Sequence, residues 1–204
     1  MERLARVREV RDRLLAGGEV FPVAIGPVEG AALRDWVQRE EARRTLETGL
    51  GYAVSTLFIC EGLLGNGPVV RHVVMDPHRR VELQSLVEAG VRDLVEFHAE
   101  GSEIVLPRLL AEGRRFDLAF IDGNHRFEGV FLDLVYCGRL LEPEAVVFVD
   151  DLQLPAIKRA VGFCLANLGW TIEDEGDEAE HEWVVLRIGS PDAFRRPFDS
   201  FVEF

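Results

Sequence analysis

The residues with the clearest chemical potential follow two apolar runs in the second half of the chain. The run FDLAFI (116–121) leads into Asp122, with His125 three positions later, and the run AVVFV (145–149) leads into the pair Asp150 and Asp151. Carboxylates brought together repel one another strongly unless a cation lies among them. Because an all-oxygen ligand set suits a hard ion, Asp122, Asp150 and Asp151 predict a magnesium site, with calcium or manganese as alternatives.

A second interpretation of these residues needs no metal. Asp122 and Asp150 could cap the helices that follow them, and His125 could donate a hydrogen bond to a neighbouring loop. If a cation is present, it could hold two neighbouring hydroxyl groups of a substrate and lower the pKa of one of them. His125 could then act as a general base, because its unperturbed pKa suits neutral pH.

A second group of polar residues surrounds a glycine turn near residue 50. Gly49 and Gly51 permit a tight turn and let a ligand approach the backbone closely. A turn that binds a nicotinamide dinucleotide would continue to a third glycine, where this chain has Val54. Glu47, just before the first glycine, would repel a pyrophosphate but suits a ligand that carries an ammonium and a sulfonium group.

Two further positions could contact an adenosine. Asp76 ends an apolar run, and its carboxylate could accept both ribose hydroxyls; the alternative is a helix N-cap before Pro77. Ser102 follows Glu100 and Gly101 and could meet an adenine edge, or it could simply cap the next helix.

These positions share one location if the chain folds as an open α/β sheet. From about residue 44, short β-branched runs alternate with helical segments, and the nearly continuous apolar strands indicate a sheet covered on both faces. The predicted strands are 44–48, 70–76, 93–98, 116–122 and 145–150, and the predicted helices are 53–64, 78–89, 103–113, 126–141 and 154–168. This alternation predicts a doubly wound parallel sheet whose ligands bind beyond the carboxyl ends of the strands.

Both ends of the chain depart from the alternation. Residues 170–175 and 181–188 are strand-like runs separated by an acidic turn, which predicts an antiparallel hairpin that closes the sheet. Helices near 2–16 and 29–43 precede the first strand, and the loop between them could fold over the carboxyl ends of the strands. We therefore expect a single domain over 1–204, with a helical cap at 1–43, a catalytic core at 44–189 and a tail at 190–204.

In this order, the motifs resemble the class I S-adenosylmethionine-dependent methyltransferases, and most closely their small cation-dependent O-methyltransferase branch. The resemblance covers about residues 44–188 and rests on E-x-G-x-G-x-x-x-S, on IDGNHRFEG and on VVFVDD. It implies an α/β fold with a mostly parallel, Rossmann-like seven-stranded sheet, and S-adenosylmethionine as the cofactor. It places Glu47, Gly49, Gly51 and Ser55 around the methionine part, Asp76 on the ribose and Ser102 near the adenine, with Asp122 shared between cofactor and metal.

The same resemblance assigns the chemistry. Catechol-type O-methyltransferases carry an Asp after strand four, a basic residue three positions on, and an Asp–Asn or Asp–Asp pair after strand five; here these are Asp122, His125, Asp150 and Asp151. This implies O-methylation of a small-molecule hydroxyl with divalent-metal assistance, with His125 and Asp122 as catalytic residues. Two departures are His125, where catechol-type enzymes carry lysine, and Asn124, where some sugar-modifying relatives carry a carboxylate.

The composition limits the partners. The formal net charge of the 204-residue chain is −13, and so negative a surface disfavours nucleic acid as a partner. The three cysteines lack metal-ligand spacing and are expected to be reduced core thiols, and the amphipathic N-terminus resembles neither a signal peptide nor a membrane span. Together these features predict a cytoplasmic protein.

The loop at Phe21–Gly30 and an aromatic tail are expected to shape the acceptor site. Four phenylalanines of this tail would be buried against the domain or against a second subunit, which makes a homodimer a reasonable expectation. They are Phe194, Phe198, Phe201 and Phe204.

Two other functions compete with methyl transfer. An NAD(P)-dependent oxidoreductase would share the sheet and the turn at Gly49 and Gly51, but the missing third glycine and the terminal hairpin count against it. A non-catalytic S-adenosylmethionine-binding protein would keep the fold and the cofactor without turnover.

Overall fold

A computed structural model describes residues 2–20, 22–78, 83–179, 181–197 and 199–204 of the chain. The chain divides into two compact units, Met1–Gly101 and Ser102–Phe204. The division falls just before the fifth helix, so each unit contains both strands and helices.

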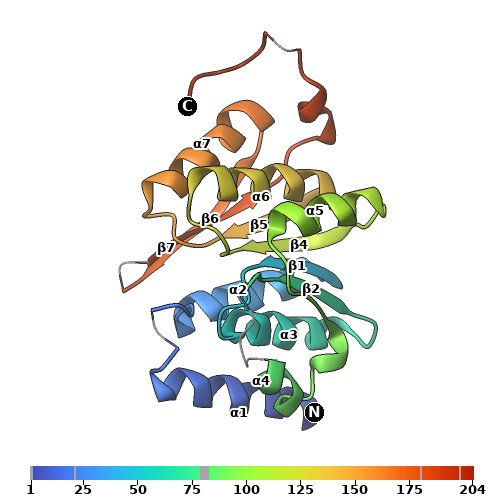
Figure 1. The fold of residues 1–204 in the computed structure, drawn as a ribbon, viewed down its shortest axis with the longest axis vertical. Helices are drawn as coiled ribbons and strands as arrows, with labels where there is room; N and C mark the ends of the chain where they lie inside the picture. Colours follow the sequence, from blue (N-terminus) through green and yellow to red (C-terminus); the bar gives the residue numbers. More distant parts are fainter. Residues whose placement is uncertain (1, 21, 79–82, 180, 198) are drawn as a thin grey trace. The chain divides into compact units, whose positions relative to one another are not determined.

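The first unit contains three parallel strands in the order β3-β2-β1. They are β1 (Arg44–Thr48), β2 (Arg71–Met75) and β3 (Val95–His98). The helices are α1 (Glu2–Gly17), α2 (Pro27–Arg39), α3 (Val54–Asn66) and α4 (Leu83–Glu88), and the 3-10 helix η1 (Arg92–Leu94) precedes β3. Helix α3 packs against both α1 and α2 (Figure 1). Every residue from 54 to 63 is buried, as expected for a helix that is apolar on all sides.

A buried ion pair joins α1 to α3. The Glu61 side chain is 2% exposed, and it accepts hydrogen bonds from Arg8 Nε at 2.6 Å and from the Arg11 guanidinium. The same guanidinium lies over the ring of Phe58, 4.3 Å from its centroid. Because both oxygens of Glu61 have cationic partners, its charge is compensated at low exposure.

Close packing of α2 on α3 depends on a glycine. A Cβ atom at Gly62 would lie 2.8 Å from Val37 Cβ and 2.9 Å from the Arg34 carbonyl oxygen, which belongs to the backbone of α2. We expect Gly62→Ala to lower the free energy of unfolding by about 1–3 kcal/mol, since the two helices must separate. Thermal denaturation followed by circular dichroism measures this. Gly17→Ala is the matched control, because nothing lies within 4 Å of its Cβ position, and an equal loss in both variants would contradict the packing argument.

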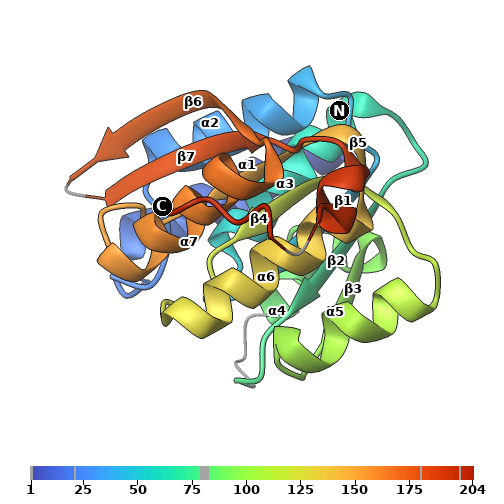
Figure 2. The same ribbon diagram turned by 90° about the horizontal axis from the view of Figure 1, so that it is seen from above.

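The second unit contains four strands in the order β4-β5-β7-β6. Strands β4 (Phe116–Ile121) and β5 (Leu141–Val149) are parallel, whereas β7 (His181–Arg187) runs antiparallel to both β5 and β6 (Thr171–Glu178). The helices are α5 (Ser102–Ala111), α6 (Phe127–Leu140) and α7 (Pro155–Leu168), followed by the 3-10 helix η2 (Pro191–Arg195). Helix α6 lies between α5 and α7 and contacts both (Figures 1 and 2). The predicted terminal hairpin is therefore present.

The C-terminal segment returns along α7 (Figure 2). The side chain of Asn167 bonds both backbone groups of Val202, at 2.8 Å and 2.9 Å, and the ring of Phe204 meets that of Phe163 edge-on at 5.3 Å. The tail thus packs against its own chain, although Phe201 stays 58% exposed. Phe198 lies outside the described residues.

Several predicted bounds differ from those observed: the predicted strand 93–98 begins with the 3-10 helix η1, and the predicted helix 29–43 ends at Arg39. The predicted helix 78–89 is observed as α4 from Leu83, and residues 79–82 lie outside the described part of the chain. Strand β5 begins at Leu141, not at 145, because Leu141 already pairs with Phe116. A register shift follows before Leu118 pairs with Val146. This irregular segment includes the charged residues Glu142 and Glu144. The apolar run in the sequence therefore begins only at residue 145, after the start of the strand.

The three cysteines are buried and free, as predicted. Burial raises the pKa of each thiol, that of Cys164 to about 12. Among the described residues, no helix is long and apolar enough to cross a membrane.

Candidate functional site

The glycine turn after β1 is held by the carboxylate that follows β2. Gly49 and Gly51 have φ values of 91° and 49°, in the left-handed region that favours glycine. The backbone N–H groups of Leu50 and Gly51 donate to Asp76 Oδ2 at 3.1 Å and 3.3 Å. Asp76 therefore lies directly after β2, as the sequence indicates, and its carboxylate also holds the glycine turn in shape.

The second oxygen of Asp76 bonds the backbone just after it. Asp76 Oδ1 accepts the N–H of His78 at 2.7 Å, and a carboxylate oxygen has two acceptor positions. The carboxylate is 7% exposed. An acceptor of this kind at a strand end fits a ribose diol. The alternative of a helix N-cap concerns residues 79–82, which lie outside the described part of the chain.

The loop between α1 and α2 lies against the glycine turn. A Cβ atom at Gly51 would be 3.4 Å from Val23 Cγ1. Val23 of this loop therefore lies beside the turn that follows β1. Phe21, the aromatic residue of the loop, lies outside the described residues.

Glu47 is buried completely and its carboxylate has three partners in its own unit. Ser55 Oγ donates to Oε1, Thr56 Oγ1 donates to Oε2 at 2.6 Å, and His72 Nε2 lies 2.7 Å from Oε2. The other ring nitrogen of His72 lies 2.9 Å from Thr45 Oγ1. Glu47 and Ser55 thus bond to each other beneath the turn, and the negative charge of Glu47 is fixed there.

Sequence reasoning missed His72 and Thr56, although a signal was present. Thr45 and Glu47 are two residues apart on β1 and so share a face, and the parallel register pairs Thr45 with His72. Three polar residues on the covered face of two adjacent apolar strands indicate a mutual hydrogen-bond network, because buried polar groups are almost always paired.

We expect His72→Ala to lower the free energy of unfolding by about 2–4 kcal/mol, because it removes a partner of a buried carboxylate and leaves a cavity. Chemical denaturation at pH 7 measures the loss. His98→Ala is the control, because the ring of His98 bonds the half-exposed carboxylate of Glu96 at 2.9 Å. A loss below about 1 kcal/mol for His72→Ala would show that the network contributes little.

Ala53 and Ser102 lie where helices α3 and α5 begin. Ala53, which sequence reasoning also missed, precedes α3 with φ 63°, a left-handed conformation that usually requires glycine. Ser102 is the first residue of α5, half-buried, in the second unit.

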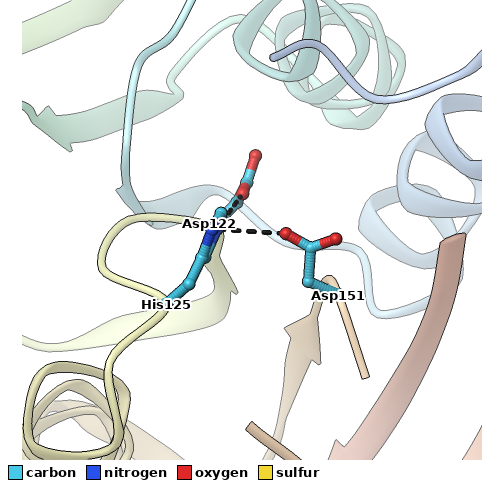
Figure 3. A group of neighbouring side chains, drawn as sticks. All are labelled: Asp122, His125 and Asp151. Atoms are coloured by element: carbon cyan, nitrogen blue, oxygen red, sulfur yellow. Dashed lines mark hydrogen bonds and ion pairs between the residues drawn. The ribbon is translucent and has the colours of Figure 1, made fainter. Parts of the chain in front are cut away.

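Asp122, His125 and Asp151 come together at the carboxyl ends of β4 and β5. His125 Nε2 lies 3.3 Å from Asp122 Oδ1 and 3.1 Å from Asp151 Oδ2, so the ring points between two carboxylates (Figure 3). The side chains of Asp122 and Asp151 are 16% and 12% exposed, whereas His125 is 46% exposed. The structure therefore brings together three of the residues that the sequence predicted here, whereas the fourth, Asp150, groups with Asp151 and His181.

The electrostatics of this group favour an added positive charge. Burial raises the pKa of Asp122 to about 8, helped by the charges of Asp150 and Asp151 and opposed by the hydrogen bond with His125. That same hydrogen bond raises the pKa of His125 above its usual value, against the effect of burial. Both shifts favour the protonated forms of Asp122 and His125. A divalent cation would supply the same compensation.

A second triad shares Asp151. His181 Nδ1, from the first residue of β7, lies 3.3 Å from Asp151 Oδ1, and Gln153 Nε2 donates to that oxygen at 2.7 Å. The Asp151 N–H donates to Asp150 Oδ1 at 2.5 Å. Sequence reasoning missed His181, because only the strand pairing brings β7 to this edge, and it also missed Gln153, which stands two residues after Asp151.

The donor chemistry fits a divalent cation. Asp122, His125 and Asp151 each offer a ligand atom within 4.8 Å of the others, and Asp150, Asp151 and His181 do the same. Asp151, which belongs to both triads, has φ 57°, in the left-handed region. Capping does not account for Asp122 and Asp150, because the N-cap positions of α6 and α7 are Arg126 and Leu154.

The known proteins that this chain resembles are methyltransferases. Residues 46–152, more than half of the chain, match the model of a methyltransferase domain family. A catechol O-methyltransferase of Mycobacterium tuberculosis is 31% identical over 134 residues, 66% of this chain and 59% of that protein. A catechol O-methyltransferase of Niastella koreensis is 27% identical over 111 residues, 54% of this chain and 50% of that protein. The matches thus span between half and three fifths of these relatives.

Solved structures show the same fold. An O-methyltransferase of Streptomyces achromogenes involved in tomaymycin synthesis, solved with S-adenosylmethionine, aligns with a TM-score of 0.75 at 20% identity over 93% of this chain and 91% of that chain. An O-methyltransferase of Bacillus cereus, solved with S-adenosylhomocysteine, also aligns at 0.75, with 18% identity and 90% of each chain covered. The chain belongs to the methyltransferase domain family and has the class I S-adenosylmethionine-dependent methyltransferase fold.

Proposed function

We propose that this protein transfers the methyl group of S-adenosylmethionine to a hydroxyl group of a small molecule, with assistance from a divalent cation. The observation that carries the proposal is the cluster of Asp122, His125 and Asp151 at two adjacent strand ends of a methyltransferase fold. The catechol O-methyltransferases among the relatives support an acceptor with neighbouring hydroxyls.

In this proposal the first unit binds the cofactor. S-adenosylmethionine supplies an activated methyl group on a sulfonium. The carboxylate of Asp76 receives a ribose hydroxyl, and the glycine turn lets the methionine part approach the backbone. Glu47 acts from beneath the turn, where Ser55, Thr56 and His72 hold its negative charge. Ser102 as an adenine contact remains a prediction from the sequence.

In this proposal the second unit binds the methyl acceptor and removes the proton of its hydroxyl group. Asp122, Asp150 and Asp151 would hold the cation, which would bind the acceptor oxygens and lower the pKa of the reacting hydroxyl. His125, exposed on one side and bonded to Asp122 on the other, would take the proton of that hydroxyl. The role of Asp122 toward the cofactor remains a prediction. The whole-chain domain organisation, a homodimer and a cytoplasmic location also remain predictions.

The decisive experiment is a calorimetric titration of the protein with S-adenosylhomocysteine, with NAD as the comparison ligand. We expect micromolar binding of S-adenosylhomocysteine and none of NAD. Acceptors are then tested with S-adenosylmethionine and magnesium, beginning with catechols and other vicinal diols. Preference for NAD would revive the oxidoreductase alternative, and binding without turnover of any diol would favour the non-catalytic one.

A further inference from the structure

The start of β7 is fastened to the loop that carries Asp151. The N–H of Leu152 donates to the carbonyl of Glu182 at 2.7 Å, and the N–H of Glu182 donates to Gln153 Oε1 at 2.8 Å. Gln153 meanwhile donates to Asp151 Oδ1 through its amide nitrogen. One glutamine thus holds both the carboxylate of Asp151 and the residue that follows His181.

This fastening places a second imidazole on the carboxylate cluster. His181 Nδ1 is 3.3 Å from Asp151 Oδ1, while His125 Nε2 is 3.1 Å from Asp151 Oδ2. Each imidazole is nearly half exposed, so neither has to be uncovered before an ion reaches it. His181 also lies within 4.8 Å of a ligand oxygen of Asp150, as a member of the triad that shares Asp151.

We propose that His181 is a ligand of the cation site, which therefore takes a first-row transition ion through an imidazole nitrogen as well as carboxylate oxygens. Imidazole suits ions such as cobalt, nickel and zinc, whereas magnesium takes oxygen ligands and gains little from it. Asp150, Asp151 and His181 form a mixed nitrogen and oxygen donor set of this kind. Gln153 orients the shared carboxylate from outside the ligand shell, as hydrogen-bond partners of metal ligands commonly do.

The inference rests on the proposed cation site and is independent of the methyl acceptor. Its test is direct binding of Co²⁺ and of Mg²⁺ to wild-type protein and to His181→Ala and His181→Asn, measured by competition with a chelating indicator. We expect either substitution to weaken Co²⁺ binding by at least about tenfold and to leave Mg²⁺ binding within about twofold. The visible absorption spectrum of bound Co²⁺ should change as well, because it reports loss of a nitrogen ligand.

The control is His98→Ala, which removes a histidine that bonds a carboxylate in the first unit. It should leave both affinities and the cobalt spectrum unchanged. Equal weakening of Co²⁺ and Mg²⁺ by the His181 substitutions would overturn the inference and show that His181 only orients Asp151. Failure of wild-type protein to bind either ion would overturn both this inference and metal assistance, and the S-adenosylhomocysteine titration would still decide methyl transfer separately.

Discussion

Asp151→Ala should lower kcat for a diol acceptor by about 100- to 1000-fold, because a polarising cation contributes several kcal/mol to such a reaction. Asp151 is the residue on which the site converges: its two oxygens lie 3.1 Å from His125 and 3.3 Å from His181. The substitution removes both oxygens that would hold a cation between these groups, whereas Asn would keep one oxygen ligand and recreate the Asp–Asn pair of the catechol-type enzymes. Steady-state kinetics at saturating Mg²⁺ measure the effect.

The fold of the Asp151 variant should survive. Removing one negative charge from the cluster relieves repulsion with Asp122 and Asp150, which both raise the pKa of their neighbours in this group. The metal-free variant should therefore melt within a few degrees of the wild type. Asp192→Ala is the control, since the side chain of Asp192 is 83% exposed and pairs only loosely with Arg195 at 3.8 Å. Full activity of Asp151→Ala would rule out cation assistance by this cluster.

Asp76→Ala should weaken S-adenosylhomocysteine binding by on the order of 100-fold, because hydrogen bonds to a charged group contribute about 1.5–3 kcal/mol each. The substitution removes the acceptor proposed for the ribose. It also frees the N–H groups of Leu50 and Gly51, which donate to Asp76 Oδ2. Isothermal titration calorimetry measures the affinity.

A second variant separates the two roles of Asp76. Asp76→Asn keeps one oxygen for the turn but loses the charge, so it should preserve thermal stability better than Asp76→Ala while still binding the ligand weakly. Asp35→Asn is the matched control, because Asp35 pairs with its neighbour Arg34 on α2 and its side chain is 62% exposed. Unchanged affinity in Asp76→Ala would exclude this carboxylate from the cofactor site.

Much of this molecule could be predicted from local patterns. The bounds of β1 at Arg44–Thr48 and the presence of the terminal hairpin follow from apolar runs and turn residues, which act over a few positions. The candidate carboxylates were also found locally, because Asp76, Asp122 and Asp150 each directly follow a buried strand. Strand ends in an open α/β sheet carry the ligand-binding residues, so their position in the sequence already indicated their use.

The partners of those residues depended on the tertiary structure. Glu47 was expected to face the cofactor, yet the parallel register of β1 and β2 brings His72 onto its carboxylate and buries both. His181 reaches Asp151 because β7 pairs antiparallel with β5, Val149 opposite Val184. The pKa of Asp122 rises to about 8 chiefly through burial. Periodicity and turn chemistry are properties of neighbouring residues, so the sequence by itself determined which elements form and where the acidic residues stand. Register and burial arise from contacts between segments that are distant in sequence. The tertiary structure alone therefore decided what surrounds those acidic residues.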